Sequence, residues 1–491
     1  MGYQAEEDAG DIAHSEFNVN RSPEDSYFNS KGLTPKDRYK LVYVIFFTAG
    51  LGTLVPWNFF ITAIDYFQYK LRNQSIENSS TIDTDYKTEE QRLFGNYLAL
   101  CSMLPLALFN VLGLSIMKWL SSFTRYTIGG VLVFLMFILT NVLVPINISE
   151  SRLMILLILL DAQAFLGITL ASVAVINAGC ALLQGGILGL ASMLPPKYIK
   201  SCLEGQAVAG VLAAVAAIVT RAASPHPTVC ALAYFIFALV VLALSVLLTL
   251  TLRKNVFFLH YQNLQCISSA NAFFVLDECK DEKSSSNDIR SCGDGSMDPT
   301  FSRDSVEIRR GATIVQSLRD VLVPGLCVWM TLMITLTLFP ALLQPIRPLE
   351  FSPTDRWTST FFTPVVIFLS FNVCDWVGRT GAGLLRWPRR SQYWLLVAIC
   401  ALRALIIPFS MFLNQYPRRH LPAVFVHDAF PALVVIFLGL SNGYLMTLSM
   451  MYGPSFAPPS RSEGAGVALS IFIALGLASG VAISAGLALL I

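Results

Sequence analysis

The sequence has little charge. Only 13% of its 491 residues are Asp, Glu, Lys or Arg, against about a quarter in an ordinary soluble domain. Apolar residues take their place and make up 54% of the chain. The net charge of +2 supplies no basic surface, so we expect no nucleic-acid partner. Long apolar runs predict an all-α polytopic membrane protein in the lipid bilayer, because a helix satisfies its own backbone hydrogen bonds there.

The sequence also lacks the motifs of common catalytic and cofactor sites. It contains no Walker A loop and no HExxH. Its ten cysteines form no CxxC pair, and none of its five histidines lies in the middle of an apolar run. We therefore expect no enzyme, no cofactor and no metal. A facilitator, or a carrier coupled to ions by carboxylates, is the class that fits.

Eleven apolar segments are long enough to be transmembrane helices. They are residues 41–62, 94–119, 126–145, 164–193, 203–223, 229–252, 317–343, 359–385, 391–413, 429–451 and 464–490. The run before the fourth span is too long for one upright helix, so we interpret 152–163 as an added apolar helical piece. Six spans, a long loop and five spans resemble the 6+5 arrangement of a transporter built from two major-facilitator-like halves.

Two polar segments predict the domain boundaries and the topology. Residues 1–40 are a tail, 41–252 a first bundle, 253–316 a loop and 317–491 a second bundle. Loop 63–93 carries glycosylation sequons at Asn73 and Asn78, and a third at Asn147 falls on the same side by parity. Segment 253–316 is basic and polar, which predicts a disordered cytoplasmic loop. The N-terminus is then cytoplasmic and the C-terminus extracellular.

Charged residues interrupt the apolar stretch LSFNVCDWVGRTGAGLLR at 368–385. Asn372, Asp375 and Arg379 share one face of a helix. A charge at mid-membrane costs about 2.5–3.5 kcal/mol on insertion scales, and pairing inside a bundle reduces that cost. The stripe is either a structural ion pair or a lining of the substrate path, and the two roles are compatible. A carboxylate that accepts and a guanidinium that donates suit a neutral polyhydroxylated solute.

Two other spans carry polar groups at depth. In the first, Pro56 predicts a kink, and Trp57 and Asn58 follow it directly. Trp57 lies too deep to be an interfacial anchor, and its ring beside an amide suits a planar heterocycle. In the fourth, Asn177 and Gln184 share a helix face, where amides act either as ligands or as contacts between helices.

Several of these segments resemble the equilibrative nucleoside transporter family. They are GLGTLVPWNFFITA, INAGCALLQGGILGLASMLPPKY, EGQAVAG, FNVCDWVGR and GLSNGYLMTLSMMYGP, spread over residues 40–490. The resemblance implies eleven transmembrane helices, a fold related to the major facilitator fold, and sodium-independent transport of nucleosides down their gradient by alternating access. It also implies a plasma-membrane location, since residues 1–39 lack the acidic dileucine signal of an intracellular branch.

The resemblance further implies roles for individual residues. Trp57 would lie beside the base, Gln184 would hydrogen-bond it, and Asp375 and Arg379 would contact the ribose hydroxyls. The remaining implied positions are cavity-lining or gating residues Asn58, Met103 and Leu106, cytoplasmic-gate residues Arg125, Asn372 and Glu463, and packing glycines Gly179, Gly205 and Gly210. The chain departs from the family where it has Ala207 and Val208 in GQAVAG, so helix faces there are expected to repack.

Two alternatives lie within the same family: an organic-cation or monoamine carrier, and a proton-coupled nucleoside carrier. The cation branch has an acid at the position of Gln206. Here the acid is Glu204, which lies two residues, or about 200°, around the helix. Lys200 stands one turn earlier, so a local ion pair is the simpler interpretation of Glu204. A receptor that only resembles a transporter is a further alternative, against which the polar stripe argues.

Overall fold

The protein is described here from a computed structural model. The described residues are 35–71, 89–117, 119–144, 162–223, 226–265, 267, 315–416, 418, 421–488 and 490. The sequons at Asn73, Asn78 and Asn147, residues 152–161 and most of the loop 253–316 lie outside them. Residues 40–491 form one compact unit, to which every helix below belongs.

The first group of helices, called here the N-terminal helices, spans about 210 residues of sequence. It comprises α2 (Leu41–Thr62), α3 (Ile64–Lys70), α5 (Glu89–Ile116), α6 (Ser122–Leu143), α7 (Ala162–Ser192), α8 (Pro196–Ala223) and α9 (Pro227–Thr251). The fifth predicted span begins earlier than expected, at Pro196, because proline is well suited to the first turn of a helix.

The second group, the C-terminal helices, is less regular. It comprises α12 (Leu322–Leu338), the π-helical segments η3 (Trp357–Phe361) and η4 (Thr363–Leu369), α13 (Ser370–Leu385), α14 (Tyr393–Leu402), the 3₁₀ turn η6 (Arg403–Leu405), α15 (Ile406–Met411), α16 (Ala429–Tyr452) and α17 (Ser462–Ala488). The predicted span 391–413 is therefore helix, 3₁₀ turn and helix, and 359–385 begins as π-helix.

Nine helices in the described part of the chain are long and apolar enough to cross a membrane. The other two predicted spans, 94–119 and 317–343, hold helices whose apolar parts are shorter, Cys101–Ile116 and Leu322–Leu338. Charged residues occupy the first turn of α5, and α12 ends two residues before Pro340, which has no N–H to continue it. The chain is thus an all-helical multi-pass membrane protein.

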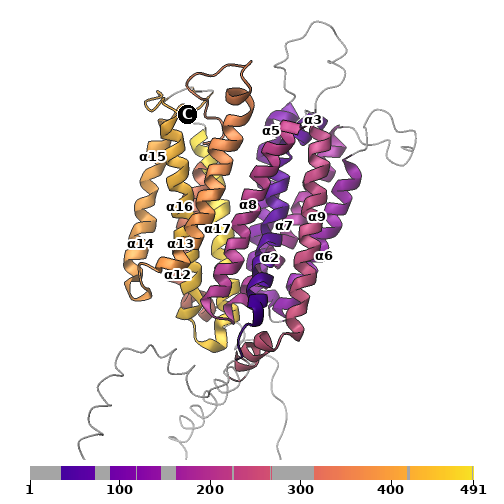
Figure 1. Ribbon diagram of the computed structural model, residues 1–491, viewed down its shortest axis with the longest axis vertical. Helices are drawn as coiled ribbons and strands as arrows, with labels where there is room; N and C mark the ends of the chain where they lie inside the picture. Colours follow the sequence, from indigo (N-terminus) through magenta and orange to yellow (C-terminus); the bar gives the residue numbers. More distant parts are fainter. Residues whose placement is uncertain are drawn as a thin grey trace, which may run out of the picture. The chain divides into compact units, whose positions relative to one another are not determined.

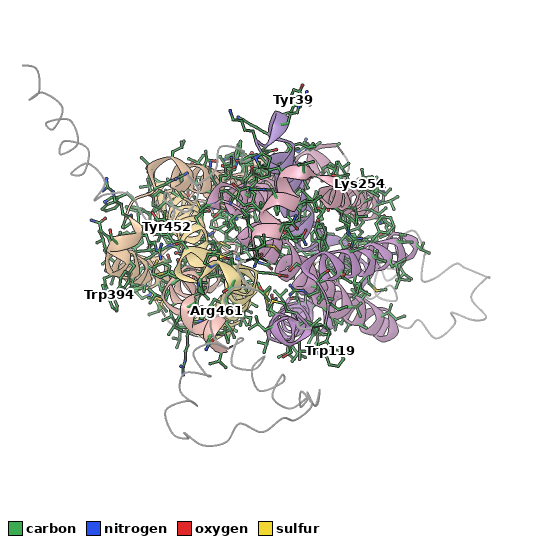
Figure 2. All side chains as sticks on the ribbon, turned by 90° about the horizontal axis from the view of Figure 1, so that it is seen from below. Tyr39, Trp119, Lys254, Trp394, Tyr452 and Arg461 are labelled. Atoms are coloured by element: carbon green, nitrogen blue, oxygen red, sulfur yellow. The ribbon has the colours of Figure 1, made fainter. Side chains whose placement is uncertain are left out.

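The two groups of helices lie side by side, with α8 and α17 where they meet (Figure 1). α8 packs on α2 of its own group and on α13 of the other, and α17 packs on α12 and also on α7 and α5. Seen along the helices, exposed Trp119 and Trp394 point outward from opposite groups (Figure 2). Large apolar side chains such as Leu247 and Leu433 are also exposed, as lipid-facing positions would be.

Candidate functional site

Asp375 and Arg379 form an ion pair one turn apart on α13. Arg379 Nε donates to Asp375 Oδ2 at 2.8 Å, and the two residues are only 4% and 5% exposed. The pair predicted from the sequence therefore exists, and it is buried. Such a pair is stable in a protein interior only when further hydrogen bonds satisfy its remaining atoms.

Two neighbouring helices supply those hydrogen bonds. On α16, Asn442 Nδ2 donates to Asp375 Oδ1 at 2.6 Å. On α8, Arg379 Nη1 donates to the Leu203 carbonyl at 2.8 Å and to Gln206 Oε1 at 3.5 Å. The guanidinium of a C-terminal helix thus reaches an N-terminal helix. Arg379 Nη2 donates to no described residue.

Small residues on both helices permit this approach of α13 and α16. A Cβ at Gly443 would lie 2.0 Å from the Asp375 carbonyl oxygen, and one at Gly378 would lie 2.3 Å from the Leu440 carbonyl oxygen. These contacts are backbone against backbone, so they leave no room for a side chain. The glycines of both helices therefore fix Asn442 against Asp375.

Gln206 connects the Asp375–Arg379 pair with α2 by a further hydrogen bond. Gln206 Nε2 donates to Thr53 Oγ1 at 3.2 Å, and Thr53 itself donates to the Gly50 carbonyl within α2. Trp57 lies one helical turn beyond Thr53, on the same face of α2. The structure thus brings the Trp57 region within one turn of a group that contacts Arg379.

The polar side chains predicted to meet the base have no internal partners. The amides of Asn58 and Gln184 and the indole N–H of Trp57 make no hydrogen bond to any described residue. Gln184 as a whole residue is 7% exposed, and its amide is not among the fully buried atoms that lack a partner, so the amide is accessible. By contrast, Asn177 Nδ2 donates to the Val173 carbonyl of its own helix at 2.9 Å. Of Asn177 and Gln184, Gln184 is the one whose amide is available to a ligand.

Met103 and Leu106 lie on α5 and belong to the main apolar core, with Trp57 packed against that core. Each is 7% exposed. The structure therefore places these two residues in the packing between helices.

The predicted gate residues Arg125 and Glu463 are together, although 338 positions separate them. Arg125 Nη2 on α6 lies 3.6 Å from Glu463 Oε1 on α17, and Ser122 Oγ donates to the same oxygen at 2.5 Å. Arg125 is 1% exposed, whereas the Glu463 side chain is 30% exposed. This ion pair connects an N-terminal with a C-terminal helix.

The third predicted gate residue, Asn372, lies on α13 against a predicted packing glycine. A Cβ at Gly210 would fall 1.9 Å from Asn372 Oδ1, so α8 and α13 meet closely here. A Cβ at Gly205 would fall 1.9 Å from the Phe47 carbonyl oxygen, which shows that this glycine serves the contact of α8 with α2. Gly179 serves the contact of α7 with α6, where a Cβ would lie 2.7 Å from Val133 Cγ2.

Glu204 forms the local ion pair expected from the sequence. Lys200 Nζ lies 3.0 Å from Glu204 Oε1. Thr380 of α13 donates to the same oxygen at 3.1 Å, and Tyr43 Oη donates to Oε2. The carboxylate thus has a cation and two hydroxyls as partners.

Three residues of this network were not predicted to belong to the site: Gln206, Asn442 and Arg403. Each is a strongly polar residue inside an apolar span, which is the signal that identified Asp375. Asn442 also belongs to GLSNG, a G-x-S-x-G string, yet Ser441 lies inside the continuous helix α16 rather than on a strand-to-helix turn.

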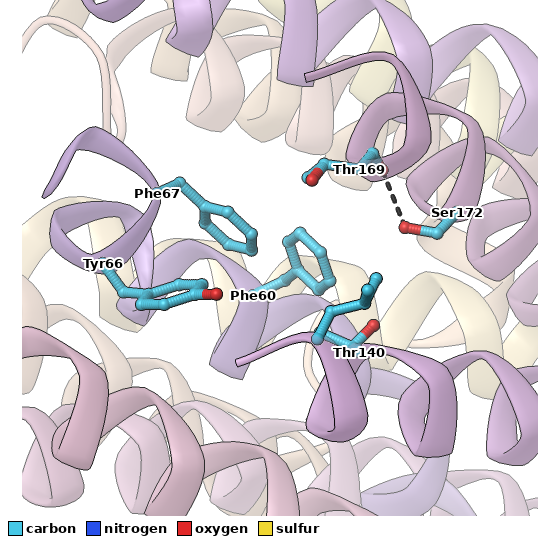
Figure 3. A pocket seen from close by; sticks show the side chains of 7 residues that line it. Phe60, Tyr66, Phe67, Thr140, Thr169 and Ser172 are labelled. Carbon is cyan, nitrogen blue, oxygen red and sulfur yellow. Dashed lines mark hydrogen bonds between the residues drawn. The ribbon is translucent and has the colours of Figure 1, made fainter. Parts of the chain in front are cut away.

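A small pocket lies elsewhere among the N-terminal helices (Figure 3). It is lined by Phe60, Tyr66, Phe67, Thr140, Leu143, Thr169 and Ser172. The Phe60 and Phe67 rings stack with their centroids 4.9 Å apart, and the Ser172 hydroxyl donates to the Thr169 carbonyl. None of the predicted substrate residues lines this pocket, so we place no substrate in it.

The fold defines a class of protein first. A solved structure of the major facilitator superfamily proton:xylose symporter XylE, bound to 6-bromo-6-deoxy-D-glucose, superimposes with a TM-score of 0.55 at 13% identity, covering 89% of this chain and 86% of the symporter. At that identity the similarity shows the fold alone, which is that of major facilitator transporters.

Sequence comparison then gives the family. The profile described as "Nucleoside transporter" matches residues 170–488. Equilibrative nucleoside transporter 1 of Rattus norvegicus is 33% identical over 464 residues, covering 92% of this chain and 97% of the relative. Equilibrative nucleoside transporter 2 of the same species is 34% identical, covering 92% and 98%. The chain belongs to the equilibrative nucleoside transporter family, a family of transporters rather than enzymes.

Proposed function

We propose that this protein moves nucleosides down their concentration gradient, without sodium, by alternating access across the plasma membrane. One observation carries the proposal: a buried Asp375–Arg379 pair at the contact with α8 leaves Arg379 Nη2 without a described partner. A carboxylate and a free guanidinium N–H together accept from and donate to neighbouring sugar hydroxyls. Ribose is the part of the substrate that we assign to them.

The N-terminal helices supply the groups for the base. Trp57 offers a ring face, and Gln184 and Asn58 offer amides that no described residue engages. An accessible amide that no protein group engages can exchange its hydrogen bonds to water for hydrogen bonds to a base. Met103 and Leu106 belong to the apolar core against which Trp57 packs, and we assign them to the lining of the cavity. Nucleobases present the donors and acceptors that such amides recognise, so nucleobases are possible further substrates.

The transport cycle that we propose uses two halves and eleven membrane helices, with α5 and α12 among them. Arg125 and Glu463 close the cytoplasmic side, and Asn372 packs against Gly210 where α13 meets α8. Gly205 and Gly179 keep the helices within each half in close contact. In this topology the N-terminus is cytoplasmic and the C-terminus extracellular.

The cation-carrier alternative receives less support from the site. Glu204 already has Lys200 at 3.0 Å and two hydroxyl donors, so its charge is matched within the protein. The proton-coupled alternative depends on Asp375 or Glu463 taking up a proton during transport. It is decided by the pH dependence of uptake.

Uptake of radiolabelled uridine and adenosine tests the proposal. Wild type is compared with Asp375→Asn and Arg379→Ala, with and without sodium, at acidic and at neutral pH. We expect saturable, sodium-independent uptake that both substitutions reduce by about a hundredfold or more at equal surface expression, because each leaves the other charge buried and unpaired. Absence of nucleoside uptake by well-expressed wild type would overturn the proposal. Faster uptake at acidic pH would favour the proton-coupled carrier.

A further inference from the structure

Arg403 is a second buried guanidinium close to the site, and it has no carboxylate partner among the described residues. It lies in η6 between α14 and α15 and is 3% exposed. Its hydrogen bonds go to neutral acceptors: the Thr331 carbonyl at 2.6 Å, Thr335 Oγ1 at 2.7 Å, Ser441 Oγ at 2.7 Å and the Leu438 carbonyl at 2.9 Å. A cation so deep in a membrane protein is costly, and such residues are usually functional.

One of these hydrogen bonds leads to Asp375. Arg403 Nη2 donates to Thr335 Oγ1, and the Thr335 hydroxyl lies 2.8 Å from Asn442 Oδ1. Asn442 Nδ2 then donates to Asp375 Oδ1 at 2.6 Å. Every donor in this chain points toward the carboxylate, and such chains strengthen each of their bonds by polarisation.

The chain also fixes which way the Asn442 amide faces. Thr335 accepts from Arg403, and its single hydroxyl proton has two acceptors at 2.8 Å, the Thr331 carbonyl and Asn442 Oδ1. Donation to Asn442 keeps the Thr335 and Asn442 oxygens from meeting without a proton between them. That bond holds the Asn442 oxygen away from Asp375 and its NH₂ group toward the carboxylate. If the amide turned over, two oxygens would face each other and Asp375 would rotate away from its position.

We propose that Arg403 is a positioning residue: through Thr335 and Asn442 it holds the Asp375 carboxylate in the orientation that accepts from a sugar hydroxyl of the substrate. The inference rests on the proposed function, because it assigns the same carboxylate to the sugar. The two guanidiniums act on different oxygens of the Asp375 carboxylate. Arg379 bonds Oδ2 directly and reaches across to α8, whereas Arg403 secures Oδ1 from the opposite side.

The chain offers a matched pair of substitutions that test this. Thr335→Val removes the hydroxyl that relays Arg403 to Asn442 while keeping nearly the same shape. Ser441→Ala removes a different hydroxyl bonded to Arg403, one that does not lead to Asp375. Both cost Arg403 one hydrogen bond, so a purely structural role for Arg403 predicts similar effects. Thr335→Ser restores the hydroxyl and serves as the rescue.

The readout is the ratio of transport efficiencies for uridine and for its 3′-deoxy analogue, each measured per transporter at the surface. In wild type and Ser441→Ala we expect the same preference for uridine. In Thr335→Val we expect that preference to fall about five- to tenfold, since one well-placed hydrogen bond to a charged group is lost. Thr335→Ser should recover it.

An unchanged ratio in Thr335→Val, alongside normal uridine uptake by wild type, would overturn this inference and leave the proposed function standing. Equal falls in Thr335→Val and Ser441→Ala would also overturn it, because they would reflect general loosening around Arg403. If wild type takes up no uridine, or does not distinguish the two nucleosides, the assignment of Asp375 to the sugar fails, and this inference fails with it.

Discussion

The N-terminal and C-terminal helices meet at two contacts that are built differently. At the α8–α13 contact, both charges of the Asp375–Arg379 pair belong to one helix, and Arg379 donates to neutral groups of α8. At the contact of α17 with α6 and α7, the two charges come from opposite groups, Arg125 from one and Glu463 from the other. Separation of α8 from α13 therefore leaves the Asp375–Arg379 pair intact, whereas separation of α17 from α6 breaks the Arg125–Glu463 pair.

This difference assigns different tasks to the two contacts. When α8 leaves α13, Arg379 loses hydrogen bonds to neutral acceptors, and a substrate hydroxyl can replace them. Hydrogen bonds that involve a charged group contribute about 1.5–3 kcal/mol each. When α17 leaves α6, a partly buried ion pair must separate. We therefore expect the first contact to govern substrate recognition and the second to govern the balance between open and closed states.

The largest effect is expected where the α7–α17 contact is backbone against backbone. A Cβ at Gly466 would lie 2.4 Å from the Leu188 carbonyl oxygen and 2.0 Å from Ser192 Oγ, whereas one at Gly486, on the same helix, would meet open space. Gly466→Ala should nearly abolish uridine uptake per surface transporter, since overpacking costs about 1–3 kcal/mol. Gly486→Ala is the control and should transport normally. Equal uptake by the two variants would show that this contact need not close.

The next largest effect is expected at the Arg125–Glu463 ion pair, whose two partners differ in burial. Glu463→Gln leaves the guanidinium of Arg125, which is 1% exposed, without its charge partner, and should destabilise the purified protein by about 3 kcal/mol. Arg125→Met leaves a carboxylate that is 30% exposed, and water can solvate it, so the loss should be smaller. Thermal unfolding in detergent measures both.

A second ion pair involving the start of α17 provides the control. Arg461 Nη2 lies 2.8 Å from Asp320 Oδ2, with side chains 27% and 20% exposed. Asp320→Asn should change stability by about 1 kcal/mol or less, as exposed pairs do. If Arg125→Met proves as damaging as Glu463→Gln, burial does not explain the asymmetry of the gate pair.

The sequence could identify these residues but not their partners. Helices and their approximate bounds follow from apolar length, and Asp375 and Arg379 follow from their charge in an apolar run. That Arg125 meets Glu463, or that Gly210 meets Asn372, depends on packing between distant segments, and the resemblance alone suggested a shared gate. The interruption at η6 was also not predicted, because the ICALRALIIP stretch has no Gly and no Pro before its end.

Burial of the main pair is the other feature that the sequence left open. The sequence left open whether the polar stripe is a structural ion pair or lines the substrate path, and the structure gives a pair 4–5% exposed with partners on two other helices. The glycines that bring α16 against α13 were visible in GLSNGYLM, but their facing residues were not. Pairing on one helix was thus predictable from spacing, whereas the enclosing network was not.

A moderate effect is expected at the α8–α13 contact, where the close approach involves a side chain. Gly210→Ala would place a Cβ 1.9 Å from Asn372 Oδ1, and Asn372 is held by a hydrogen bond from its Nδ2 to the Phe368 carbonyl. Uptake should fall about threefold or more, since neighbouring residues couple by about 0.5–3 kcal/mol. The double variant Gly210→Ala/Asn372→Ala should transport as well as Asn372→Ala alone. Additive losses would mean that the two residues do not meet during transport.

The smallest effect on nucleoside uptake is expected at Glu204. A substitution there distinguishes the nucleoside-carrier hypothesis from the cation-carrier hypothesis. Glu204→Gln keeps one oxygen that accepts from Thr380 or Tyr43, whereas its NH₂ group cannot accept from the other hydroxyl. It also loses the charge paired with Lys200 one turn away. Exposed pairs of this spacing contribute about 0.3–0.5 kcal/mol, and the Lys200 side chain, 16% exposed, can still bring its ammonium to water, so uridine uptake should change by less than about threefold. Uptake of a labelled organic cation is measured in the same cells. If wild type carries the cation and Glu204→Gln abolishes that flux while sparing uridine, then Glu204 recognises cations, and the α8–α13 contact serves a second class of substrate.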